Sequence, residues 1–283
     1  MIKIQDKYLD IPIIQGGMGV GVSLSSLAGN VAKCGGMGVI SGAHPGYNYE
    51  GFRQNPHLVN KIALKEHIYK AKEIANGKGM IAVNLMVAGK HYDEYVESAI
   101  EGGCDAIISG AGLPLDLPKY AKGKTLLAPI VSSGKAMKLI LRVWDKRYQY
   151  TPDFVVIEGS EAGGHLGFKK EDLLNQTTQI LEDILKDVLN ELTPFIEKYK
   201  KHIPVFVAGG VDTGLKISKY IKLGATGVQI ATPFITTYEC DAQQNFKDMV
   251  INCQEDDLEI VKSPTGIPGR AIVNEFVKKT RER

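Results

Sequence analysis

Residues 204–214 read PVFVAGGVDTG, and residues 224–233 read GATGVQIATP. Each stretch begins as a short apolar strand, ends in small residues and continues into a helical pattern. Thr213 is well suited to cap the helix that follows the two glycines. Neither strand alternates polar with apolar residues, which is typical of parallel strands covered by helices on their outer side. The two stretches therefore predict an α/β fold.

The same strand–turn–helix unit recurs along the chain. We predict eight buried strands, over residues 11–14, 37–41, 80–84, 105–109, 126–131, 154–158, 205–208 and 227–231. Helices are predicted over residues 23–33, with Ser23 as N-cap, and over 61–75, 92–101, 135–147 and 215–223. Eightfold alternation favours a (β/α)8 TIM barrel that forms one domain over residues 1–283. A doubly wound parallel sheet is the structural alternative.

Two connections are longer than the others. Residues 159–204 carry a long apolar periodicity and predict an extended helical insertion after the sixth strand. Thr193 and Pro194 resemble an N-cap followed by proline at the first helical position, so we predict two helices divided there. This insertion either packs on the neighbouring helix, forms a dimer contact or covers a site. Residues 43–60 carry three aromatic side chains that either cover an apolar substrate or fold back on the barrel, namely Tyr47, Tyr49 and Phe52.

Composition excludes several classes of protein. The 283 residues carry 34 Lys and Arg against 32 Asp and Glu, a net charge of +2 that indicates neither a nucleic-acid nor a membrane partner. No apolar run approaches the ~18 residues of a membrane span, and the alternating N-terminus is unlike a secretory signal. The four cysteines lack metal-ligand or disulfide spacing. We therefore expect a cytoplasmic protein without a metal centre.

Glycine is abundant, with 31 residues, and its positions are informative. Six of the predicted strands end in turns of small residues: 16–19, 42–46, 110–112, 132–134, 159–167 and 209–210. In a barrel, all of these turns lie on the carboxyl rim, where barrel enzymes build their sites. Because glycine lets backbone approach a ligand closely, this rim predicts a bed for a flat ligand.

The turns after the last two strands predict an anion pocket. Backbone N–H groups of Gly209, Gly210, Ala231 and Thr232, together with a helix N-terminus, are suited to a phosphate. Phosphate sites after strands seven and eight recur in such barrels. The alternative is a tight helix–strand junction that needs small residues.

A histidine follows the sixth strand in the segment EGSEAGGHLG, residues 158–167. Imidazole is the usual acid or base near neutral pH, and the strand-end position predicts that His165 is catalytic. Glu158 is interpreted as a ligand or orienting group, and Glu161 as solvated or capping. His44 is a weaker second candidate. The remaining histidines are interpreted as surface residues: His57, His67, His91 and His202.

Asn84 ends the third predicted strand, where its amide offers a donor and an acceptor to a heterocycle or simply caps the strand. Gln15 and Gln229 have the same chemistry in weaker positions. The chain has no nucleophile elbow and no complete dinucleotide-binding glycine motif. These features favour a phosphate-bearing flat cofactor such as FMN beside a proton-transferring imidazole. A phosphosugar isomerase would need a second acid or base that the sequence does not offer.

Motifs along nearly the whole chain resemble the nitronate monooxygenase family, whose superfamily includes the flavin-dependent enoyl-acyl carrier protein reductases. They are IQGGMG (14–19), AVN (82–84), SGAG (109–112), EAGGH (161–165), AGG (208–210), GATGVQ (224–229) and TGIPGRA (265–271). The resemblance implies an FMN-binding TIM barrel with His165 as catalytic histidine. Combined with the residue patterns, it predicts this cofactor-binding set: Gly17, Met18, Gly19, Asn84, Glu158, Gly163, Gly164, Gly209, Gly210, Gln229, Ala231 and Thr232.

The chain departs from the family at two positions. Ala231-Thr232 replaces a common Gly-Thr pair, and Gly16-Gly17-Met18 replaces the Ala-Pro-Met of the better-known nitronate enzymes. The Gly-Gly-Met sequence is similar to that of the enoyl reductase branch. From the family resemblance we expect oxidation of alkyl nitronates. NAD(P)H-dependent reduction of an enoyl thioester and FMN binding without efficient turnover are the alternatives. The expected partners are a small-molecule substrate and a second copy in a homodimer.

Overall fold

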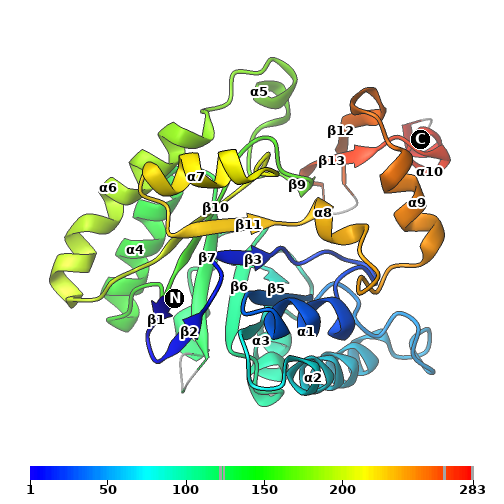
Figure 1. The fold of residues 1–283 in the computed structure, drawn as a ribbon, viewed down its shortest axis with the longest axis horizontal. Coiled ribbons are helices and arrows are strands. Elements are labelled where there is room, and N and C mark those ends of the chain that lie inside the picture. The colour runs from blue at the N-terminus through cyan, green and yellow to red at the C-terminus, as the bar shows by residue number, and fades with distance from the viewer. Residues whose placement is uncertain (121–122, 124, 264–265, 282–283) are drawn as a thin grey trace.

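Eight parallel strands close into a barrel in the computed structural model, which describes residues 1–120, 123, 125–263 and 266–281 (Figure 1). In chain order the strands are β3 (Ile13–Gln15), β4 (Met37–Ser41), β5 (Met80–Met86), β6 (Ala106–Gly110), β7 (Leu126–Val131), β8 (Val155–Glu158), β10 (Val205–Ala208) and β11 (Gly227–Ile230). The ring closes between β11 and β3, where Val228 pairs with Ile13. Closure confirms the TIM barrel and excludes the doubly wound sheet, because an open sheet leaves two unpaired edges.

A hairpin that the sequence pattern did not predict precedes the barrel. Its strands β1 (Ile2–Ile4) and β2 (Lys7–Leu9) pair antiparallel. Ile4 and Leu9 are buried in the same cluster as the barrel interior, which includes Phe154 and Phe206 in edge-to-face contact at 5.9 Å. The hairpin therefore closes the amino end of the barrel and leaves the carboxyl end for a site.

Helices cover the outside of the barrel: α1 (Ser25–Lys33), α2 (Pro56–Ala75), α3 (Tyr92–Glu101), α4 (Gly134–Tyr148), α6 (Leu181–Tyr199) and α7 (Gly214–Lys222). The prediction of Ser23 as the cap of α1 is wrong. The carboxylate of Asp241 accepts hydrogen bonds from the amides of Leu24, Ser26 and Leu27 instead. Thr213 caps α7 as predicted, accepting from the Lys216 amide at 3.3 Å.

Two further helix predictions need correction. Helix α2 begins at Pro56 rather than at residue 61, because Asn55 caps it and Pro56 occupies its first turn. Helix α6 runs without a break through Pro194, so the predicted division is wrong. Phe195 and Ile196 beyond the proline still pack against the core, and this apolar packing outweighs the hydrogen bond that proline removes.

The predicted helical insertion after the sixth strand is present, and α6 packs on its neighbour α4. A Cβ on Gly134 of α4 would lie 2.8 Å from the Cβ of Asp187 in α6, so the two helices approach closely. Lys138 and Glu191 form an ion pair across this interface at 3.0 Å. The shorter helix α5 (Lys170–Leu174) precedes α6.

A second small sheet lies at the carboxyl end of the barrel. It contains β9 (Gly164–His165), β12 (Leu258–Lys262) and β13 (Pro268–Ile272), in the order β12-β13-β9. Figure 1 shows it beside the short helix α8 (Thr232–Ile235), with α9 (Gln244–Asn252) and α10 (Glu275–Arg281) nearby. Two 3-10 turns, Leu117–Tyr120 and Glu255–Asp257, complete the elements of the described chain. None of the described helices combines the length and apolarity needed to cross a membrane.

Candidate active site

The turn after β3 packs against the end of β5. A Cβ on Gly17 would lie 2.5 Å from the Cβ of Asn84, so only glycine allows this backbone to reach the asparagine side chain. The Asn84 amide donates to the Ile108 carbonyl at 3.3 Å, which fixes its orientation. A Cβ on Gly19 would lie 2.7 Å from the Cβ of Ala43. These glycines form a tightly packed floor on one side of the rim.

Met18 is fixed inside the same turn. Its amide donates to the Ser23 hydroxyl at 2.8 Å, and its carbonyl accepts from the Ser23 amide at 2.9 Å. Its half-buried side chain packs on the cluster around Val22, Leu27 and Cys240. Since the backbone polar groups are engaged within the turn, any contact of Met18 with a bound ring would come from its side chain.

The ends of β11 and β3 meet on the same rim. A Cβ on Gly16 would lie 3.2 Å from the Cβ of Ala231 and 3.5 Å from the Gln229 side-chain amide nitrogen. Gln15 is fully buried and bonds to the backbone of Val39, so it is a structural residue. Thr232 begins α8, which has only four residues. An anion here would be bound by individual backbone amides, because so short a helix has little dipole.

The Gly209-Gly210 turn contacts the loop that carries the histidine. Both glycines have positive φ, 94° and 72°, so the turn requires glycine. A Cβ on Gly209 would lie 3.0 Å from the Gly159 carbonyl oxygen and 3.1 Å from the Ala162 nitrogen. Within the described chain, the Gly210 amide has no hydrogen-bond acceptor from the protein. This backbone donor is therefore available to an anion at the turn.

His165 lies in β9, on the strand pairing between this loop and β13. It is partly buried, and burial lowers the pKa of its imidazole. The imidazole is therefore neutral near pH 7 and suited to accept a proton. Gly163 and Gly164 before it are exposed, and a Cβ on either would meet nothing within 4 Å.

Arg270 fixes the histidine loop from the far end of the chain. One of its guanidinium nitrogens donates to the Ser160 carbonyl at 2.7 Å and to the Ala162 carbonyl at 2.8 Å. The Leu166 amide donates to the Pro268 carbonyl at 2.8 Å. Arg270 belongs to the 265–271 motif, but its role was not predicted from the sequence; an arginine between small residues near the C-terminus was the available signal. Thr265, which begins that motif, lies outside the described residues.

The two carboxyl groups of the 158–161 segment differ in burial. Glu158 ends β8, and burial raises its pKa to about 8, so it is largely protonated at neutral pH. It can then donate as well as accept hydrogen bonds. Glu161 lies against the Gly209-Gly210 turn: a Cβ on Gly210 would be 3.0 Å from the Glu161 Cβ and would collide with its carboxylate. This carboxylate would have to turn away before an anion could reach the turn.

The other predicted rim residues have clear positions. His44 is exposed, with Nδ1 3.3 Å from the Asn60 amide nitrogen and its ring edge-on to Phe52. The aromatic residues of this connection fold back: Tyr49 donates to Glu66 of α2 at 3.0 Å. The prediction of His67 as a surface residue is wrong, because it is buried between Pro45 and Ser25 and bonds to both.

The profile of the nitronate monooxygenase family matches residues 2–283. The chain belongs to this family. It is 25% identical over 293 residues to a probable nitronate monooxygenase of Staphylococcus saprophyticus, and the match covers 96% of this chain and 78% of that protein. A probable nitronate monooxygenase of Staphylococcus aureus is also 25% identical, over 299 residues with the same shares.

Solved structures of similar fold include FabK from Thermotoga maritima, with a TM-score of 0.74 and 24% identity over 97% of this chain and 75% of that chain. Nitroalkane oxidase from Streptomyces ansochromogenes has a TM-score of 0.74 and 20% identity, over 96% and 79% of the two chains. These two structures support the fold. Membership of the nitronate monooxygenase family makes the chain a flavin-dependent oxidoreductase of that type.

Proposed function

We propose that this family member binds FMN across the carboxyl rim and oxidises alkyl nitronates with O2 to carbonyl compounds and nitrite. The observation that carries the proposal is the contact between the Gly209-Gly210 turn and the loop of His165. It brings the Gly209-Gly210 turn against the beginning of the loop that continues to His165.

The described residues fit a phosphate-bearing flat ligand in two ways. Within the described chain the Gly210 amide lacks a protein acceptor, and the glycine floor at Gly17 has no room for a side chain beside Asn84. The fit requires Glu161 to turn its carboxylate into solvent, which its exposed position allows. FMN would supply the redox chemistry that the side chains lack.

The proposed cofactor set is distributed around the rim. Gly209, Gly210, Ala231 and Thr232 would hold the phosphate. Asn84, Gln229 and Glu158 would offer hydrogen bonds to the ring system, and the three residues of the 17–19 turn, with Gly163 and Gly164, would line it.

The histidine would act on the substrate rather than on the cofactor. With its pKa lowered by burial, the neutral His165 imidazole has one N–H that would donate to an oxygen of the nitro group and orient it, and one bare nitrogen that can accept a proton. The small sheet keeps the imidazole on the rim, and Arg270 keeps the loop closed against the Gly209 turn.

Two measurements test the proposal. Purified protein should show a flavin absorption spectrum and should release nitrite from an alkyl nitronate in air. His165→Asn should lower turnover by about 10²–10⁴-fold, as expected for loss of an acid–base group. His44→Asn, at the other rim histidine, is the matched control and should retain activity.

Anaerobic mixing separates the alternatives. Rapid bleaching of the flavin by NADH, with slow nitrite release, would replace the proposal by an enoyl thioester reductase. A flavin that no donor reduces would indicate a binding protein without efficient turnover. Full activity of the His165→Asn variant would remove the imidazole from the mechanism.

A further inference from the structure

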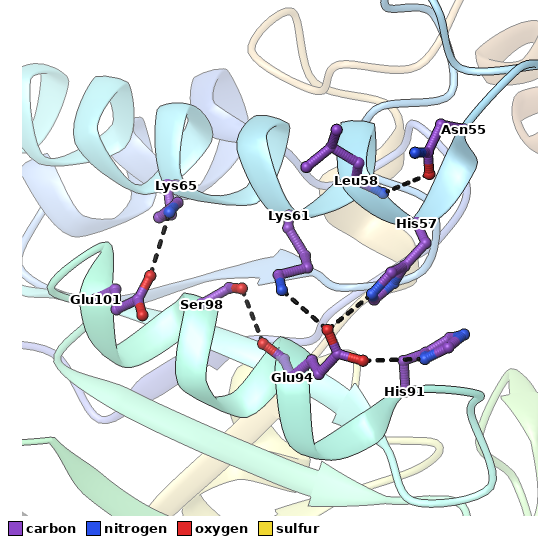
Figure 2. Close-up of polar contacts among 9 residues, drawn as sticks. All are labelled: Asn55, His57, Leu58, Lys61, Lys65, His91, Glu94, Ser98 and Glu101. Carbon is purple, nitrogen blue, oxygen red and sulfur yellow. Dashed lines mark hydrogen bonds and ion pairs between the residues drawn. The ribbon is translucent and has the colours of Figure 1, made fainter.

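Two histidines and a glutamate come together outside the flavin rim (Figure 2). His57 lies in the first turn of α2, His91 immediately precedes α3, and Glu94 lies in the first turn of α3. These helices follow neighbouring barrel strands, so their N-termini lie at the carboxyl end of the barrel. The sequence did not reveal the cluster, because His57 and His91 belong to different strand–helix units.

The ligand atoms converge. His57 Nε2 is 2.8 Å from one Glu94 carboxylate oxygen, and His91 Nδ1 is 3.1 Å from the other. The two imidazole rings stack at 4.0 Å between centroids with an interplanar angle of 26°. One ligand atom from each residue lies within 4.8 Å of the others. Two imidazole nitrogens and one carboxylate oxygen form a set that zinc-type ions favour, with a fourth position open to water.

We propose that His57, His91 and Glu94 bind a divalent transition-metal ion of the zinc class. Metal–ligand distances of about 2.0–2.2 Å require the three atoms to surround a common centre. The side chains are 30%, 49% and 42% exposed, so they can make this adjustment. The bound ion would join the first turn of α2 to the start of α3.

Lys61 competes with the ion. Its ammonium is 2.9 Å from the Glu94 oxygen that also contacts His57, and Figure 2 shows both groups meeting at this carboxylate. Lys61 is 31% exposed and can move into solvent when an ion arrives. Its charge nevertheless opposes that of the metal, so removing it should tighten binding.

The partner of the imidazole nitrogen that does not bind the ion sets the expected affinity. His57 Nδ1 is buried and has no hydrogen-bond partner within the described chain. Metal-bound imidazoles normally donate their other ring N–H to an acceptor, and losing such a partner weakens binding by about 10–100-fold. We therefore expect micromolar rather than nanomolar affinity.

Calorimetric titration with ZnCl2 tests the proposal on the untagged chain of 283 residues after removal of adventitious metal. We expect one site with a Kd below about 100 µM. His57→Gln and His91→Gln should each raise the Kd about tenfold or more, and Lys61→Met should lower it. His202→Gln is the matched control, because His202 is exposed and outside the cluster.

A wild-type Kd above about 100 µM would overturn the three-ligand site. A Kd that changes in only one of the variants His57→Gln and His91→Gln would overturn it as well. Equal loss in His202→Gln would show nonspecific surface binding and would overturn it as well. Co2+ absorption of the wild-type chain gives a measurement that does not depend on variants. Intense visible bands support a four-coordinate site, and the weak bands of hexa-aqua Co2+ at stoichiometric metal would refute it.

Discussion

Replacing Arg270 by methionine should disable the enzyme without touching a reacting group. The guanidinium makes two charged hydrogen bonds, at 2.7 and 2.8 Å, to the loop that carries His165. Hydrogen bonds to charged groups contribute about 1.5–3 kcal/mol each. Because Arg270 is partly exposed, the freed carbonyls can rehydrate, so we take the lower value, about 3 kcal/mol for the pair.

A penalty of that size would reduce the closed-loop population by up to roughly 100-fold. Strand pairing to β13 persists in the variant, including the bond from the Leu166 amide to the Pro268 carbonyl. We therefore expect kcat for nitrite release from an alkyl nitronate to fall about 10–100-fold. Arg270→Lys should recover part of the loss. Arg142→Met, which removes an exposed arginine, is the control.

The pH profile distinguishes loop positioning from general destabilisation. Burial lowers the pKa of His165, so an opened loop should return that pKa towards its ordinary value. If neutral imidazole is the active form, the acid limb of the kcat profile should then move to higher pH. A kcat within threefold of wild type, or a lower kcat with an unmoved acid limb, would refute this account of Arg270.

Three further predictions concern the rim. Gly210→Ala should weaken FMN binding about tenfold, because φ is 72° and a left-handed alanine costs about 1–2 kcal/mol; Gly214→Ala, where a Cβ meets nothing within 4 Å, should not. Glu161→Gln should tighten FMN binding about 3- to 10-fold by removing a carboxylate beside the phosphate turn, measured by fluorescence titration. Glu158→Gln should stabilise the flavin-free protein at alkaline pH. The raised pKa of Glu158 favours folding at low pH, and this stability is lost as pH rises from about 5 to about 8.

Each of these has an outcome that contradicts it. Equal FMN affinity in the Gly210 and Gly214 variants would show that the turn does not hold the phosphate. Weaker binding after Glu161→Gln would make that carboxylate a ligand instead of an obstacle. Denaturation midpoints of wild type and Glu158→Gln that stay parallel between pH 5 and 9 would show that Glu158 ionises freely in the fold.

Local sequence determined the barrel strands closely. The predicted strands 37–41, 126–131 and 205–208 coincide with β4, β7 and β10. Short runs of Val and Ile between glycine turns carry this information within a few residues, so no distant contact is needed to read it. The glycine motifs likewise located the rim, because strand ends in a barrel all face one side.

Tertiary structure decided what holds the site together. Asp241 caps α1 from 214–217 residues away, and Arg270 reaches the histidine loop across 108–110 residues. The path of α6 through Pro194 was likewise settled by packing against the core. A sequence pattern reports the preferences of neighbours along the chain, whereas these contacts exist only after barrel closure has brought distant segments together.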